Sequence, residues 1–74
     1  MTPESPPMTV GVRERRKSLG LTQAQLAEAI GVSRQTIISI ERSDYAPSVY
    51  LALRLAVRLN STVEQLFPLE GESR

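Results

Sequence analysis

The sequence contains no cysteine and no histidine among its 74 residues. Their absence excludes disulfide bonds, thiolate chemistry, imidazole catalysis and the usual zinc ligand sets. The sequence also offers no nucleophile–base set, no phosphate-cradling loop and no cluster of metal ligands. We therefore expect neither an enzyme nor a protein that holds a metal ion or another cofactor, and no small-molecule ligand is indicated.

Long apolar runs are also missing. No stretch approaches the ~20 apolar residues that a bilayer-spanning helix needs. The first eight residues, MTPESPPM, lack the basic and apolar regions of a secretory signal. These features predict a cytoplasmic protein without a membrane partner.

Aromatic residues are scarce, with one Phe, two Tyr and no Trp, although 41% of the residues are hydrophobic. The core must therefore consist of Ala, Leu, Ile and Val, which suits closely packed helices. A chain of this length forms one domain near the lower size limit for an independent core.

The formal net charge is only +1, but it is unevenly distributed. Between Thr9 and Phe67, eight basic residues face five acidic ones, which gives this segment a net charge of +3. This balance fits an ordinary solvated surface as well as a nucleic-acid interface, so charge alone does not decide the function.

The chain divides into a domain at residues 9–67 and two flanking segments. Residues 1–8 contain three prolines and no periodicity, which predicts a disordered arm, and residues 68–74 form a short tail. Between them, helical periodicity and closely spaced stop and start signals predict five helices and no strand. The predicted helices span about residues 10–19, 23–30, 34–42 and 49–59, and a short fifth helix runs from residue 63 to 66 or 67.

The connection between the second and third predicted helices is short. Gly31 can end a helix in the left-handed conformation, and Ser33 can cap the next helix. Thr22 and Gln25 form a T-x-x-Q capping box at the start of the second helix. A three-residue turn that begins with Gly is typical of a helix-turn-helix. Small or apolar residues at the helix crossing and in the turn support it, namely Ala27, Val32, Ile37 and Ile40.

Five stretches in order carry a family resemblance. They are LTQAQLAEAIGV and SRQTI at residues 21–37, IER at 40–42, PS at 47–48 and VEQLF at 63–67. Together they resemble the Xre-like helix-turn-helix family of phage Cro proteins and repressors, over about residues 12–67. The resemblance implies a compact all-α, five-helix lambda-repressor-like domain that binds double-stranded operator DNA, usually as a dimer on a two-fold-related site.

In this motif the second helix enters the major groove, and its N-terminal residues contact base edges. Since Ile37 and Ile40 face inward, the resemblance implies base contacts by residues on the outer face. The geometries of the side chains favour guanine for arginine, adenine for glutamine and a thymine methyl group for isoleucine. The alternatives are that the arginine touches only phosphate and that the isoleucine is an isolated surface residue. The predicted base-contacting residues are Arg34, Gln35, Ile38 and Ser39.

The resemblance also implies phosphate contacts. Gln23 resembles a family glutamine that binds a DNA phosphate. This residue lies at a helix N-terminus, and a helix N-terminus favours anions. The predicted phosphate-contacting residues are Gln23, Thr36, Arg42 and Tyr45. Two positions depart from the family pattern. Ser43 stands where Gly is frequent, which predicts a strained turn, and Asp44 replaces a residue that is often basic.

Arg16 resembles the arginine of a buried family ion pair, with Glu41 as its partner. The alternative is a phosphate contact, but a buried glutamate without a partner would be costly. The neighbouring Arg13, Arg15 and Lys17 are expected on a mostly solvated face.

Nine of the eleven residues in VYLALRLAVRL, residues 49–59, are apolar. A helix on so small a domain cannot bury all its faces within one monomer. We expect one stripe to face inward and a second to form a homodimer interface, although the second stripe could also pack under the flanking segments. The inward stripe is Val49, Ala52, Leu55, Ala56 and Leu59; the dimer stripe is Tyr50, Leu53 and Val57, helped by Phe67 and Leu69.

The favoured hypothesis is a sequence-specific DNA-binding transcriptional regulator, a repressor that binds an inverted-repeat operator as a homodimer. Two alternatives share the fold, an antitoxin with a protein partner and a restriction–modification controller protein. A third is a helical protein-interaction module that has lost DNA binding.

Overall fold

The computed structural model of the chain describes residues 11–68. Within this range there are five α-helices and no strand, which confirms the predicted fold class. None of these helices is both long and apolar enough to cross a membrane. The predicted N-terminal arm, and residues 69–74 of the predicted tail, lie outside the described residues. The helices are α1 (Val12–Ser18), α2 (Gln23–Ile30), α3 (Arg34–Glu41), α4 (Val49–Arg58) and α5 (Val63–Leu66).

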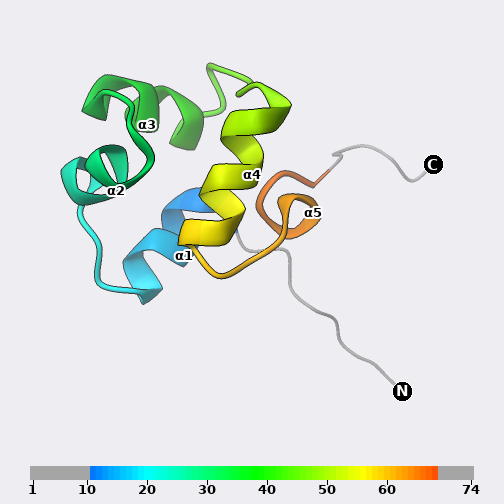
Figure 1. Cartoon of the computed structure of the whole chain (residues 1–74), viewed down its shortest axis with the longest axis horizontal. Coiled ribbons are helices and arrows are strands. Elements are labelled where there is room, and N and C mark those ends of the chain that lie inside the picture. Colours follow the sequence, from blue (N-terminus) through cyan, green and yellow to red (C-terminus); the bar gives the residue numbers. More distant parts are fainter. Residues whose placement is uncertain (1–10, 69–74) are drawn as a thin grey trace.

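The helices are arranged around α4, which runs through the middle of the domain (Figure 1). Helices α2 and α3 lie together on one side of it, and α5 lies on the other. Helix α2 packs against both α3 and α4, while α1 contacts α3. This arrangement leaves one side of α3 at the surface.

Side chains just before the helices satisfy backbone donors that would otherwise lack a partner. Thr22 Oγ1 accepts from the backbone N–H of Gln25 at 3.0 Å, and Gln25 Oε1 accepts from the N–H of Thr22 at 2.8 Å. The predicted capping box is therefore present. Each such cap contributes about 0.5–2 kcal/mol to helix stability. Equivalent caps begin the three following helices, at Ser33, Ser48 and Thr62.

The turn between α2 and α3 has the predicted form. Gly31 has a φ of +78°, in the left-handed region, and the N–H of Val32 donates to the carbonyl of Ala27 at 3.0 Å. The Val32 side chain packs partly buried against the core. Because the turn closes in three residues, α3 is held across α2 at a fixed angle.

The core is aliphatic, as the scarcity of aromatic residues predicts. The most deeply buried residues of the core come from α2, from α3, and from α4 with its C-terminal cap residue. Phe67 and other apolar side chains pack at the edge of the core. Since every helix contributes at least one residue, the core joins all five helices around one centre. The largest fully buried side chains are Leu26, Ile30, Ile37, Leu55 and Leu59.

The prediction that Val49 faces inward was wrong, because this side chain is 77% exposed. The rest of the predicted inward stripe is buried. Val49 is the first residue of α4 and borders a hollow of about 410 Å³ between the α3–α4 loop, α4 and α5. The first turn of α4 therefore has no packed neighbour on that side. Helices α1, α3 and α4 also end one residue earlier than predicted, at Ser18, Glu41 and Arg58, and α1 begins at Val12 rather than near residue 10.

Ser43 occupies the left-handed region with a φ of +63°, where a side chain costs roughly 1–2 kcal/mol. We expect Ser43→Gly to raise the free energy of unfolding by about 0.5–1 kcal/mol, because glycine adopts this conformation without steric strain. The same change at Ser18, the last residue of α1, should lower it, by less than the roughly 1 kcal/mol that glycine costs in a helix interior. Urea unfolding followed by circular dichroism measures both. A Ser43→Gly protein no more stable than the wild type would contradict this account of the turn.

Candidate nucleic-acid interface

The exposed face of α3 begins directly after its cap. Arg34 and Gln35 are the first two residues of the helix, and both side chains are exposed, whereas Ile37 and Ile40 are buried. Residues four apart lie on the same face of a helix. Arg34 therefore shares a column with Ile38, and Gln35 shares one with Ser39.

Ile38 is half-buried, so the prediction of an exposed isoleucine was wrong. Residues three apart are neighbours on a helix surface, and Ile38 adjoins Glu41, whose side chain is only 3% exposed. The buried arc of α3 therefore extends to Glu41 and includes part of Ile38. Ser39 is also half-buried.

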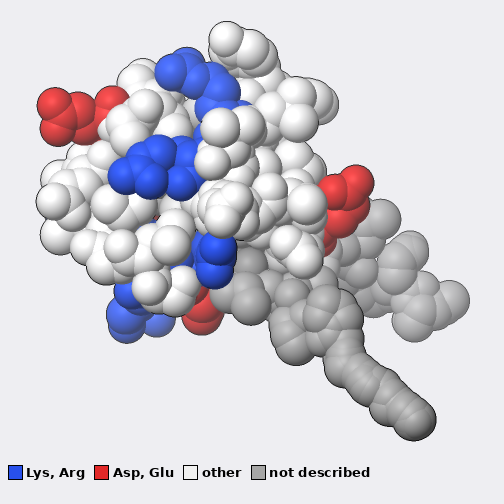
Figure 2. Space-filling model, turned by 60° about the horizontal axis from the view of Figure 1, so that its bottom comes forward, with Lys and Arg blue, Asp and Glu red and all other residues white. Residues whose placement is uncertain are grey.

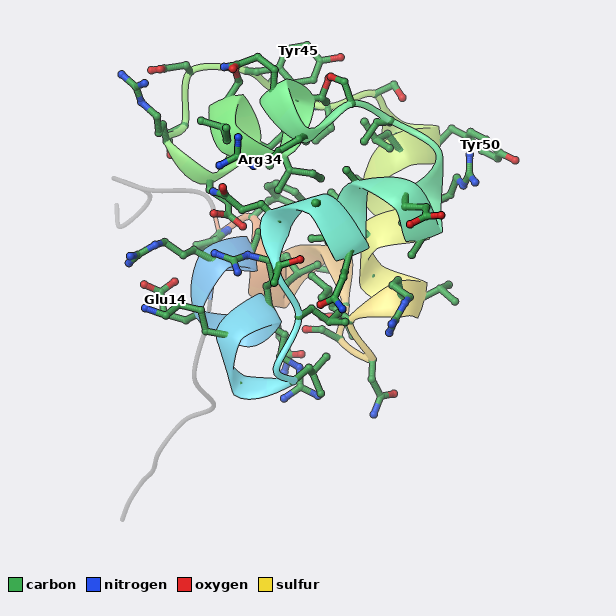
Figure 3. All side chains as sticks on the ribbon, turned by 90° about the vertical axis from the view of Figure 1, so that its left-hand side faces the viewer. Glu14, Arg34, Tyr45 and Tyr50 are labelled. Carbon is green, nitrogen blue, oxygen red and sulfur yellow. The ribbon has the colours of Figure 1, made fainter. Side chains whose placement is uncertain are left out.

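A small hollow of about 200 Å³ joins α3 to the loop that follows it. Gln35 and Ser39 line it together with Tyr45, which the α3–α4 loop brings back toward the start of the helix. Figure 3 shows Arg34 and Tyr45 at the same end of the molecule, while Tyr50 projects from another edge. The structure thus brings predicted base-contacting and phosphate-contacting residues to one surface.

Two other predicted phosphate ligands already have partners within the protein. Thr36 is half-buried, and its Oγ1 lies 3.0 Å from Ser33 Oγ, within the cap of α3. Arg42 Nε lies 3.4 Å from Asp44 Oδ2 in a pair whose side chains are 70% and 58% exposed. An exposed pair of this kind contributes less than about 1 kcal/mol, so Arg42 can exchange Asp44 for a phosphate at little cost.

Arg16 and Glu41 form a buried ion pair between α1 and the last residue of α3. Arg16 Nε donates to Glu41 Oε2 at 2.7 Å, and Arg16 Nη2 donates to Glu41 Oε1 at 3.3 Å. Arg16 Nη1 donates to the carbonyl of Leu21 at 2.7 Å. The side chains are 11% and 3% exposed, so the contact is shielded from water. It ties together α1, the α1–α2 loop and α3.

The half-buried Gln23 contacts the same carboxylate. Its Nε2 donates to Glu41 Oε1 at 3.1 Å. Sequence reasoning assigned Gln23 to a phosphate and missed this bond, which joins residues 18 positions apart. The glutamine thus lies between the buried ion pair and the surface at the start of α2.

Arg15 is half-buried, although it was expected on a mostly solvated face. Its Nε donates to the carbonyl of Leu59 at 2.8 Å, and its Nη2 donates to that of Asn60 at 3.2 Å. A cation is favourable at the C-terminal end of a helix, here α4. No sequence signal identifies this contact, because its partners are 44 and 45 residues away.

Three of the residues predicted for a dimer interface form an exposed stripe on α4. Tyr50, Leu53 and Val57 are 71%, 51% and 82% exposed. The guanidinium of Arg54 lies 5.7 Å from the centre of the Tyr50 ring and borders the stripe. Phe67 is instead half-buried and lines the hollow beside Val49.

Charge is dispersed on the face drawn in Figure 2. Its basic side chains form separate groups among uncharged ones, and acidic side chains lie toward the edges. Among the described residues, the basic side chains drawn on this face therefore do not join into one continuous patch.

A family model described as helix-turn-helix matches residues 12–66, which include all five helices. The chain belongs to the Xre-like helix-turn-helix family. The expected family resemblance is thereby confirmed. Family membership makes the chain a DNA-binding regulator in the broad sense.

Relatives match this Xre-like chain over most of its length. It is 52% identical over 62 residues to an uncharacterised HTH-type transcriptional regulator of Methanothermobacter thermautotrophicus, a match that covers 82% of this chain and 90% of the relative. It is 42% identical over 62 residues to the uncharacterised HTH-type transcriptional regulator YgzD of Bacillus subtilis, covering 84% and 94%.

Solved structures show the same fold. The restriction–modification controller protein C.AhdI from Aeromonas hydrophila superposes with a TM-score of 0.70 at 34% identity, covering 76% of this chain and 85% of that one. The biofilm master regulator SinR, in complex with DNA, superposes with a TM-score of 0.66 at 30% identity, covering 72% and 86%.

Glu41→Ala should lower the free energy of unfolding by about 3–5 kcal/mol, because it leaves the buried charge of Arg16 without a partner. A loss of this size is a large part of the roughly 5–15 kcal/mol by which native domains are stable. Asp44→Ala removes an acid from an exposed pair and should cost less than about 1 kcal/mol. Thermal and urea unfolding of the two variants measure the difference. Equal losses would show that burial does not set the strength of the Arg16–Glu41 pair.

Proposed function

We propose that this Xre-like protein binds a specific double-stranded DNA site through the major groove and represses transcription in the cytoplasm by occupying a promoter. The observation that carries the proposal is the exposure of Arg34 and Gln35 at the start of α3, the second helix of the motif. N-terminal residues of this helix contact base edges in helix-turn-helix complexes. Both side chains can make two hydrogen bonds to one base.

The two columns on α3 supply different chemistry. Arg34 and the exposed part of Ile38 present a guanidinium and an apolar group, which suit guanine and a neighbouring thymine methyl group. Gln35 and Ser39 present an amide and a hydroxyl, and the amide suits adenine. These four side chains together would distinguish short base sequences more sharply than the positive charge of the protein alone can.

Phosphate contacts on either side would orient α3 in the groove. Gln23 lies at the N-terminus of α2, where free backbone N–H groups favour an anion. Arg42 and Tyr45 are exposed just beyond α3, and Thr36 lies on its first turn. These groups add affinity and fix the register without specifying sequence.

The exposed stripe on α4 supports a homodimer. The stripe consists of exposed apolar side chains along α4. Because Val49 is also exposed, the apolar surface begins at the first residue of this helix. Tyr50 projects away from Arg34 and Tyr45 (Figure 3), so pairing through α4 leaves α3 free. A two-fold dimer would place two recognition helices about 34 Å apart, one turn of B-DNA, on an inverted repeat.

A second candidate is a restriction–modification controller protein. The 34% identity to C.AhdI over 76% of the chain favours it. It would use the same DNA-binding surface, so the genes adjoining the bound site would separate it from a repressor of other genes. The antitoxin and the protein-interaction module gain no support from the matches described above.

Selection of binding sites from a random duplex library, at two salt concentrations, tests the proposed DNA recognition. We expect an inverted repeat, with one position of each half-site losing its base preference by roughly tenfold in Gln35→Ala, since a bidentate contact contributes about 1–3 kcal/mol. Glu28→Ala, an exposed change on α2, should leave the selected sequence unchanged. Recovery of no preferred sequence by the wild type would argue for the protein-interaction module.

Leu53→Glu tests the homodimer. A charge in the middle of the apolar stripe should convert a dimer to monomers in sedimentation equilibrium, because the paired glutamates would be desolvated and would repel each other. Leu19→Glu makes the same change at an exposed leucine next to α1 and should leave the dimer intact. A Leu53→Glu protein that remains dimeric would exclude this face as the interface.

A further inference from the structure

The Glu41 carboxylate is the meeting point of three structural elements. It accepts hydrogen bonds from Arg16 on α1 and from Gln23 at the first position of α2, and it is itself the last residue of α3. Its side chain is 3% exposed, so water does not compete for these bonds. A buried carboxylate with both oxygens occupied in this way is fixed in position.

The bond from Gln23 determines which way its amide faces. An ionised carboxylate only accepts hydrogen bonds, so the amide must present Nε2 rather than Oε1 to Glu41. The amide nitrogen carries two hydrogens at about 120° to each other. When one is directed at the buried Oε1 atom of Glu41, 3.1 Å away, the other is directed away from it. In the bonds described for residues 11–68, that second hydrogen has no acceptor.

We infer that Glu41 is a positioning residue for DNA binding: its carboxylate holds the Gln23 amide so that the second Nε2 hydrogen is presented to a phosphate oxygen. This inference rests on the proposed function. Glu41 does not itself touch DNA, since its side chain is buried and a carboxylate would repel a phosphate. Glu41 contributes to the affinity for DNA by orienting the Gln23 amide.

The same arrangement links phosphate contact to base contact. Gln23 opens α2, and Glu41 ends the helix that carries Arg34 and Gln35. A hydrogen bond between them fixes the separation between the phosphate-binding amide and the base-contacting face. A phosphate held by Gln23 therefore sets how far along the groove α3 lies.

The test needs a protein that keeps its fold but lacks the carboxylate. Replacing a buried ion pair by apolar residues of similar volume is often neutral or stabilising, so Arg16→Met combined with Glu41→Leu serves as the scaffold. This double change also leaves the net charge unchanged. Gln23→Ala is then introduced into both the wild type and the double variant, and affinity for the selected duplex is measured for all four proteins.

We expect Gln23→Ala to weaken binding about tenfold in the wild type, the size of one hydrogen bond to a charged group. The double variant should lose a similar factor, and Gln23→Ala should then have almost no further effect. A full tenfold effect of Gln23→Ala in the double variant, or none in the wild type, would overturn the inference. Failure of the wild type to bind any duplex would instead reject the proposed function.

Nuclear magnetic resonance of the wild type gives a second test that does not depend on the stability of the double variant. In the free protein, one Nε2 proton of Gln23 should be shifted downfield and protected from exchange by its bond to Glu41. On addition of the duplex, the other proton should shift while the first stays in place. Two equivalent, rapidly exchanging amide protons in the free protein would show that Glu41 does not orient Gln23.

Discussion

The buried contact between Arg16 and Glu41 is the constraint on which the relative placement of α1, the α1–α2 loop and α3 depends. An apolar core sets which faces of the helices meet, but aliphatic side chains tolerate some sliding of one helix past another. A two-point bond between a guanidinium and a carboxylate is directional and fixes orientation as well as distance. Because Arg16 also binds the Leu21 carbonyl, the loop leading into α2 is held by the same side chain.

Much of this fold could be predicted from the sequence, because it depends on interactions between residues that are close together along the chain. The capping box at Thr22 and Gln25, the left-handed Gly31 and the cap at Ser33 each depend on residues within four positions of one another. The inward placement of Ile37 follows from helical periodicity. These local signals fix where α2 begins and ends and where α3 begins, so the helix-turn-helix follows directly from them.

Contacts between distant residues could not be predicted in this way. Arg15 binds carbonyl groups at the end of α4, and Gln23 binds Glu41, yet neither pair shows any pattern along the chain. Val49 is exposed beside a hollow that the α3–α4 loop and α5 also line, and the sequence of α4 does not encode where those two segments lie. For the Arg16–Glu41 pair, resemblance to a family supplied what spacing could not.

On α3, the residues that pack in the core are different from the residues that are exposed. This separation affects how related proteins can diversify. Ile37 and Ile40 supply the packing of this helix, whereas Arg34 and Gln35 are exposed. Surface substitutions of this kind usually change stability by no more than about 0.5 kcal/mol. After gene duplication, the two exposed positions can therefore mutate freely without endangering folding. Under the proposed function, one scaffold can in this way give rise to regulators with different DNA targets and the same core.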